Sequence, residues 1–184
     1  EPEPEMNILY FNFEDNNKQG WFNYLDDVTF KFKPINKTVF NSFEGNWSIG
    51  IGLGEHLYEG DSYRPVRIFR SPVFRLQERF EITAYFAGGS GIGPGVISSP
   101  PTGLADRNYG YRCLALRRIN DNKYISHTGR SSNGNNWEKG TMNKDSLYDG
   151  ASISLADEYT LDLVLSRFGN FSYILMDAVY IKHI

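Results

Sequence analysis

Apolar and polar residues alternate with a period of two along much of this 184-residue chain. The clearest case is Arg79 to Phe86, where every second residue from Phe80 on is apolar, and Asp26 to Lys33 repeats the pattern. A period of two is typical of a strand with one buried face and one face in water. The i, i+3, i+4, i+7 spacing of an amphipathic helix is not sustained anywhere over three turns. The pattern predicts an all-β protein without long helices.

Further strands are predicted where β-branched and aromatic residues cluster between turn signals. They are Met6 to Phe13, Thr38 to Phe43, Trp47 to Leu53, Val66 to Arg70, Tyr111 to Ile119, Lys123 to Thr128, Thr160 to Leu165 and Phe171 to Ile184. Pro34 is expected to end the strand before it, and Gly129 to Gly140 is predicted to be a polar loop. Short connections favour antiparallel pairing, so we expect a sandwich of about ten to twelve short strands.

Composition is consistent with one folded domain. An aromatic share of 15% with 18 Gly suits an all-β chain with many turns. Residues 1–5, Glu-Pro-Glu-Pro-Glu, are predicted to be a linker or disordered lead, and residues 6–184 a single domain. A net charge of -3 and a pI near 5.6 argue against binding to nucleic acid or an anionic membrane. No apolar run approaches the roughly 20 residues that span a bilayer.

No convincing catalytic set is visible in the sequence. His56, His127 and His183 are scattered and lack metal-ligand spacing. No Gly-x-Ser-x-Gly elbow occurs, and the single cysteine, Cys113, is predicted to be a buried small hydrophobe in a strand. Acidic residues are plentiful, so a glycosidase pair of carboxylates could always be nominated, but nothing in the sequence singles one out, because the required separation is spatial. We therefore expect a protein that is not an enzyme.

Four short motifs, in order along the chain, resemble a known fold family. They are Phe13-Glu14-Asp15, then Gly20-Trp21, then Ser71-Pro72-Val73-Phe74, and finally a strand with one internal acid, Asp177. Together they resemble the galactose-binding-like jelly-roll sandwiches, above all MAM-type extracellular domains and carbohydrate-binding modules. MAM domains usually have several cysteines, whereas this chain has one. The resemblance implies an antiparallel jelly-roll β-sandwich.

The resemblance also implies a structural calcium ion where the first and last strands meet. Residue by residue, it carries over to Glu14 and Asp177, with Asp15 as a further ligand. The chemistry of the residues agrees, because Ca²⁺ takes six to eight oxygen ligands and the loop after Phe13 supplies several. The alternative is that Glu14 and Asp15 are solvated turn residues and that Asp177 caps a backbone group.

Three aromatic residues in loops are candidates for stacking against sugar rings: Tyr63, Tyr109 and Trp137. Arg112 and Arg130, together with Arg117 and Arg118, lie near two of them in sequence. Their guanidinium groups would suit an acidic glycan or a protein carboxylate. The alternatives are that Trp137 packs over the base of its loop and that Arg117-Arg118 forms a strand edge with one solvated charge.

These observations favour a non-catalytic extracellular or cell-surface module that binds carbohydrate and holds a structural calcium. One alternative is a MAM-like adhesion domain whose partner is a cell-surface protein. Another is a jelly-roll enzyme that acts on polysaccharides. Fold analogy supplies most of this argument, and a fold does not determine a function. The oligomeric state stays open.

Overall fold

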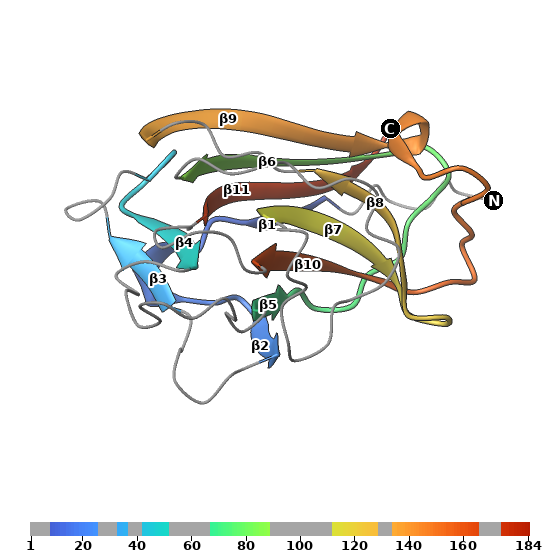
Figure 1. Cartoon of the computed structure of the whole chain (residues 1–184), viewed down its shortest axis with the longest axis horizontal. Coiled ribbons are helices and arrows are strands. Elements are labelled where there is room, and N and C mark those ends of the chain that lie inside the picture. Colours follow the sequence, from blue (N-terminus) through green and yellow to red (C-terminus); the bar gives the residue numbers. More distant parts are fainter. Residues whose placement is uncertain are drawn as a thin grey trace, which may run out of the picture.

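Two antiparallel sheets lie face to face in the computed structural model, which describes residues 8–25, 33–36, 42–51, 67–88, 112–128, 134–165 and 174–184. Figure 1 shows the two layers, with β9, β6 and β11 in one and β8, β7 and β10 in the other. In the described residues the helical segments are two short 3-10 turns, η1 (Glu14–Asn16) and η2 (Lys144–Ser146). The all-β prediction is confirmed.

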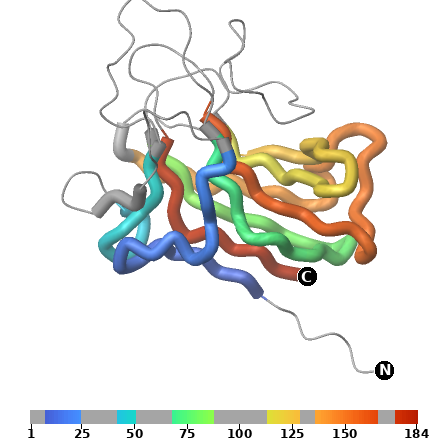
Figure 2. Tube along the Cα trace, turned by 90° about the horizontal axis from the view of Figure 1, so that it is seen from below, coloured from blue at the N-terminus to red at the C-terminus, as the bar shows by residue number. Residues whose placement is uncertain are grey.

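The first sheet contains both ends of the described chain. Its path is β3-β4-β11-β6-β9, and β1 also pairs with β11. The strands are β1 (Leu9–Phe11), β3 (Lys33–Asn36), β4 (Trp47–Ile51), β6 (Phe80–Gly88), β9 (Gly134–Asn143) and β11 (Ile174–His183). Leu9 pairs with Ile181 and Phe11 with Val179, so the first and last described strands lie side by side (Figure 2).

The second sheet has the order β2-β5-β10-β7-β8. Its strands are β2 (Phe22–Leu25), β5 (Arg67–Arg70), β7 (Arg112–Arg118), β8 (Lys123–Thr128) and β10 (Tyr159–Leu165). Strand β10 is central, with β5 on one side and β7 on the other. The hairpin of β7 and β8 turns at residues 119–122, between the two strands that the sequence predicts on either side.

The core fills the space between the sheets with alternate residues from each strand. The second sheet contributes Phe69, Leu161 and Leu163, and the first contributes Phe80 and Ile82. The inward set of β6 is the set that its alternation predicts. In β10 every side chain is buried, on both faces of its sheet. The outer face of the second sheet is therefore not a simple water-facing surface.

Two of the motifs from the sequence meet in this core. Trp21 stacks on Phe69, with ring centroids 5.4 Å apart, and the edges of Phe11 and Phe13 contact it. Gly20 precedes it with a φ of +86°, and a Cβ there would lie 2.9 Å from Pro72 Cγ. Both the positive φ and the contact require a residue without a side chain. Gly20 of the Gly-Trp motif and Pro72 of the Ser-Pro motif thus pack against each other.

The structure corrects three details of the sequence interpretation. Pro34 lies within β3, opposite Ile49, instead of ending a strand; β3 is at the sheet edge, where a missing N–H is tolerated. The polar segment predicted as a loop forms β9 from Gly134 on, paired along β6. Strand β2, directly after Trp21, was not predicted. The expected strand Asp26 to Lys33 lies outside the described residues except for Lys33.

No helix in the described part of the chain is long and apolar enough to cross a membrane. The predicted boundary between a lead of residues 1–5 and the domain falls outside the described residues.

Candidate functional site

Charged and polar side chains lie on the outer face of the second sheet, opposite the core. Arg70 is the last residue of β5 and follows the core residue Phe69. Asp162 lies between Leu161 and Leu163 on β10, and it pairs in register with Arg70. Because side chains alternate between faces, Arg70 and Asp162 project away from the core on neighbouring strands. Both are buried, and Asp162 is 0% exposed.

The Asp162 carboxylate receives hydrogen bonds from three strands. Arg70 binds it with two of them, Nε to Oδ1 at 2.8 Å and Nη2 to Oδ2 at 2.9 Å. The Tyr124 hydroxyl from β8 donates to Oδ2 at 2.7 Å, and Thr160 Oγ1 donates to Oδ1 at 3.4 Å. A bidentate guanidinium–carboxylate pair fixes both groups in one plane. These hydrogen bonds fix the positions of the side chains around Asp162.

Burial and charge act together on the groups around Asp162. Burial by itself would lower the pKa of Arg70, but the hydrogen bond and the charge of Asp162 outweigh it, and the pKa is raised. Burial also raises the pKa of the Tyr124 hydroxyl. It raises the pKa of Cys113 to about 12, so this thiol is not an activated nucleophile. The expectation that Cys113 is buried in a strand is confirmed.

Strand β2 adds aromatic rings to the same face. The guanidinium carbon of Arg70 lies 3.5 Å from the centre of the Tyr24 ring, a cation–π contact. Tyr24 is 47% exposed and its neighbour Phe22 is 48% exposed. Exposed rings beside a buried ionic pair give the face an apolar surface with polar groups at its border. Each of the five strands β2, β5, β10, β7 and β8 contributes at least one of these side chains, counting Arg117 from β7.

The predicted calcium residues meet at residues 43–46, before β4. Both Glu14 carboxylate oxygens accept from the Asn46 N–H at 3.1 Å, and the Trp47 N–H donates at 3.3 Å. Asp177 Oδ2 accepts from the N–H groups of Phe43 and Glu44, each at 3.1 Å. The structure thus brings Glu14 and Asp177 to one loop. In it, Asp177 caps backbone groups, as the alternative interpretation expected.

Excess negative charge accumulates at this loop. Burial raises the pKa of Asp177 to about 7; the nearby charges of Glu44 and Glu14 act in the same direction, against two backbone hydrogen bonds. Oε1 of Glu44 is buried without a hydrogen-bond partner. Asp15, by contrast, is exposed. Within the described ranges, no three His, Cys, Asp or Glu side chains are arranged to hold a metal ion.

The same loop places Phe43 against the outer face of the first sheet. The Phe43 ring stacks on the Tyr85 ring, with ring centroids 3.5 Å apart and an interplanar angle of 9°. The centroid of the Trp137 ring lies 6.3 Å from that of Phe43. Phe43 is exposed, while Tyr85 and Trp137 are half-buried. We call these three residues the Phe43 cluster. Trp137, a predicted ligand residue, therefore belongs to the first sheet and not to the face around Asp162.

The other predicted ligand residues do not form a described group with Trp137. Tyr63, Tyr109 and Arg130 lie outside the described residues. Arg112 is the first residue of β7, in the same sheet as Arg70 and Asp162, and pairs with Leu165. The ligand set predicted from the sequence stays a prediction.

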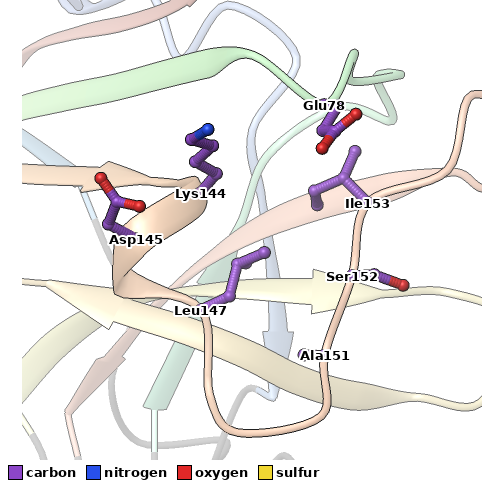
Figure 3. Close-up of a pocket in the computed structure, with 7 residues that line it drawn as sticks. All are labelled: Glu78, Lys144, Asp145, Leu147, Ala151, Ser152 and Ile153. Carbon is purple, nitrogen blue, oxygen red and sulfur yellow. The ribbon is translucent and has the colours of Figure 1, made fainter.

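A cavity of about 530 Å³ lies beside the turn η2 (Figure 3). Its lining is Glu78, Lys144, Asp145, Leu147, Ala151, Ser152 and Ile153. None of these residues was predicted as a site residue. The aliphatic side chains Leu147, Ala151 and Ile153 pack against the main core. These side chains cover the core beside η2, and the ionic face around Asp162 shares no lining residue with the cavity.

Sequence reasoning missed Arg70, Tyr24, Tyr124 and Asp162. One signal was available: Asp162 is a lone acid inside an otherwise apolar strand, Tyr-Thr-Leu-Asp-Leu-Val-Leu. The same signal had drawn attention to Asp177. A buried carboxylate in such a strand needs a partner, but the sequence does not identify Arg70 as that partner.

The two sheets form an antiparallel β-sandwich of the jelly-roll type, and solved structures of carbohydrate-binding modules and adhesin domains have a similar fold. No family model matches the sequence, and no curated protein matches it. The evidence for the fold comes from solved structures.

Three such structures cover nearly the whole chain. The K1 cleaved adhesin domain of Lys-gingipain (Kgp) from Porphyromonas gingivalis W83 aligns over 97% of this chain and 99% of its own, with a TM-score of 0.57 and 15% identity. TmCBM61, in complex with β-1,4-galactotriose, aligns over 94% of each chain, with a TM-score of 0.54 and 13% identity. The CBM22-1 xylan-binding domain of Xyn10C from Paenibacillus barcinonensis aligns over 97% and 96%, with a TM-score of 0.51 and 16% identity. At these identities the likeness shows the fold alone.

The buried pair on the outer face gives a first prediction. Asp162→Ala leaves the buried Arg70 guanidinium without its counter-ion, so we expect the free energy of unfolding to fall by about 3–5 kcal/mol. Asp121→Ala is the matched control, because Asp121 forms an equally short but more exposed ion pair with Arg118. That change should cost about 0–1 kcal/mol. Urea denaturation measures both; equal losses would show that the Asp162 pair is not the buried anchor described here.

His127, on β8, gives a prediction about pH. Burial lowers the pKa of His127 below its usual value. Folding therefore favours the neutral form of His127. The resulting contribution to stability is fully present above the pKa of His127 in the unfolded chain, about 6.5. It is lost as the pH falls through the lower pKa of His127 in the folded protein. We expect the difference in unfolding free energy between the wild type and His127→Asn to shrink as the pH drops below about 6.5. A slope unchanged in His127→Asn would contradict the assignment.

Proposed function

We propose that this protein is a non-catalytic module that binds carbohydrate on the outer face of the β2-β5-β10-β7-β8 sheet. The observation that carries the proposal is the Arg70–Asp162–Tyr124 network beneath the exposed ring of Tyr24. Its groups are held by one another before binding, so little side-chain entropy remains to be lost.

The chemistry of the face suits a sugar. A pyranose ring has apolar C–H faces and a border of hydroxyl groups, and protein sites for such ligands combine aromatic surface with a few fixed polar groups. Tyr24 and Phe22 supply exposed aromatic surface, and the guanidinium groups supply hydrogen-bond donors. Two structures with this fold, TmCBM61 with galactotriose and the xylan-binding CBM22-1, support a glycan as the ligand class.

The test compares two exposed aromatic residues on opposite sheets. We expect Tyr24→Ala to weaken binding to whichever polysaccharide the wild type retains by about tenfold or more, equivalent to about 1.4 kcal/mol. Phe43→Ala, the matched control on the other sheet, should leave binding unchanged. Affinity electrophoresis and calorimetry against galactan, xylan and other polysaccharides provide the measurement. Loss of binding in Phe43→Ala alone would place the site on the other sheet.

A protein-adhesion function is the second candidate, favoured by the Kgp adhesin domains and by the Phe43 cluster. Exposed aromatic residues are enriched at protein interfaces, and Phe43 presents one on the first sheet. A module of this kind would have a cell-surface protein as partner and would act, like the glycan-binding module, outside the cell. An enzymatic role is tested separately: release of reducing sugar from a bound polysaccharide would overturn the non-catalytic proposal.

We also propose a structural calcium ion at residues 43–46. Glu14 and Asp177, the two predicted ligands that meet there, are the side chains that would contribute to it, and backbone or water oxygens would have to complete the set, because no three such side chains converge among the described residues. A bound cation would supply positive charge, and it would stabilise the buried Asp177 carboxylate and the unpartnered Glu44 Oε1. Gly45, with a φ of +63°, leaves room for the Glu14 carboxylate, which a Cβ would overlap. Asp15 is exposed and is the weakest of the predicted ligands.

Thermal melts test the calcium proposal. A ligand at about 100 times its dissociation constant adds about 2.7 kcal/mol to the stability of the folded state, which for a chain of this size raises Tm by several degrees. We expect this rise in excess calcium over chelator, and its loss in Glu14→Gln and Asp177→Asn. Asp121→Asn is the control and should keep it. Identical wild-type melts in calcium and in chelator would overturn the calcium site.

A further inference from the structure

The outer face of the second sheet carries an imbalance of charge. Two guanidinium groups, Arg70 and Arg117, face one carboxylate, Asp162. Arg70 takes both oxygens of that carboxylate in close hydrogen bonds. Arg117 Nε lies 4.0 Å from Asp162 Oδ2, beyond hydrogen-bond distance. One positive charge on this face therefore lacks a close counter-ion among the described residues.

Arg117 is held by neutral groups instead. Its Nε donates to Thr160 Oγ1 at 2.9 Å, and its Nη1 donates to Asn122 Oδ1 at 3.1 Å. A guanidinium group has five N–H donors, so these two bonds fix its plane and leave Nη2 without an acceptor in the described part of the chain. The side chain is oriented, and donors remain for a ligand.

The electrostatic surroundings agree with the geometry. Burial lowers the pKa of Arg117, and the charge of Arg70 lowers it further, against the opposing effect of Asp162. An anion placed beside Arg117 would therefore stabilise its charged form. Arg117 is also the most accessible of the three ionised groups, at 11% side-chain exposure against 6% for Arg70 and 0% for Asp162.

Arg118, the neighbouring arginine on the same hairpin, has a carboxylate partner of its own. Arg118 binds Asp121 through two hydrogen bonds, at 3.0 and 2.7 Å. Its pKa is raised, chiefly by the hydrogen bond to that carboxylate. Adjacent in sequence, Arg117 and Arg118 thus differ in having a dedicated counter-ion. Arg118 is for this reason the matched control for Arg117.

We propose that the glycan bound on this face is acidic, and that the carboxylate of one of its sugar units pairs with Arg117. This inference rests on the proposed function, and it specifies the ligand class of the same face. The ligand chemistry is a sugar ring with a carboxylate, which occurs as a uronic acid within a polysaccharide or as a sialic acid at a chain end.

The experiment uses ligand pairs that differ in charge. Oligogalacturonate is compared with its methyl ester, and sialyllactose with lactose, by calorimetry on the whole chain. We expect one acidic member to bind about tenfold more tightly than its neutral partner, equivalent to about 1.4 kcal/mol. The pair that shows the preference identifies the source of the carboxylate. Because the contact is ionic and partly exposed, the preference should decrease at high salt in the wild type.

Variants then locate the charge. Arg117→Gln should remove the preference for the acidic ligand, whereas Arg118→Gln should keep it. The salt dependence of the wild type tests the proposal without relying on a variant that folds. Equal affinity for both members of each pair, or binding of galactan or xylan but of neither acid, would overturn the acidic ligand while the proposed function stands. Binding to no glycan at all would overturn both.

Discussion

One carboxylate organises the outer face of the second sheet. Asp162 lies on the central strand β10 and is linked to Arg70 on β5 and Tyr124 on β8, with Arg117 of β7 at 4.0 Å. Tyr24 of β2 joins through the guanidinium group of Arg70. A charge buried without partners would be prohibitively costly. The positions of Arg70, Tyr124 and, through Arg70, Tyr24 therefore depend on Asp162, whereas Arg117 is held by Thr160 and Asn122.

On the first sheet, carboxylates also position neighbouring groups, but their partners differ from those of Asp162. Glu14 and Asp177 come from the two ends of the described chain and bind backbone N–H groups of one loop. Through that loop they place Phe43 over Tyr85. Around Asp162 the carboxylate is matched by guanidinium groups, whereas Glu14 and Asp177 accept hydrogen bonds from backbone N–H groups, and Glu44 Oε1 has no partner among the described residues. Among the described residues, the two sites thus have charge imbalances of opposite sign.

Periodicity predicted the fold well and the site poorly, for one physical reason. Alternation reports which side chains face the core, so β6, β8 and β10 were recognised from apolar residues alone. Strand β9 was taken for a loop because Gly-Asn-Asn-Trp-Glu-Lys has little β-propensity, and its pairing with β6 is a long-range contact. Arg70 and Asp162 are 92 positions apart. Their meeting depends on the register of β5 with β10, about which local patterns say nothing. The proximity of Glu14 and Asp177 was predicted because the resemblance compares whole chains, and their role as calcium ligands stays a prediction.

The polar face is stronger evidence for function than for stability. Replacing a buried ion pair by apolar residues of similar volume is often neutral or stabilising, so folding alone does not require Arg70 and Asp162 on this sheet. The flanking positions of β10, Leu161 and Leu163, show that the strand uses apolar residues where only the core is concerned. A second guanidinium, that of Arg117, adds a charge that the network does not neutralise. A face that only packed would gain nothing from this second charge, and this is the argument for an anionic ligand.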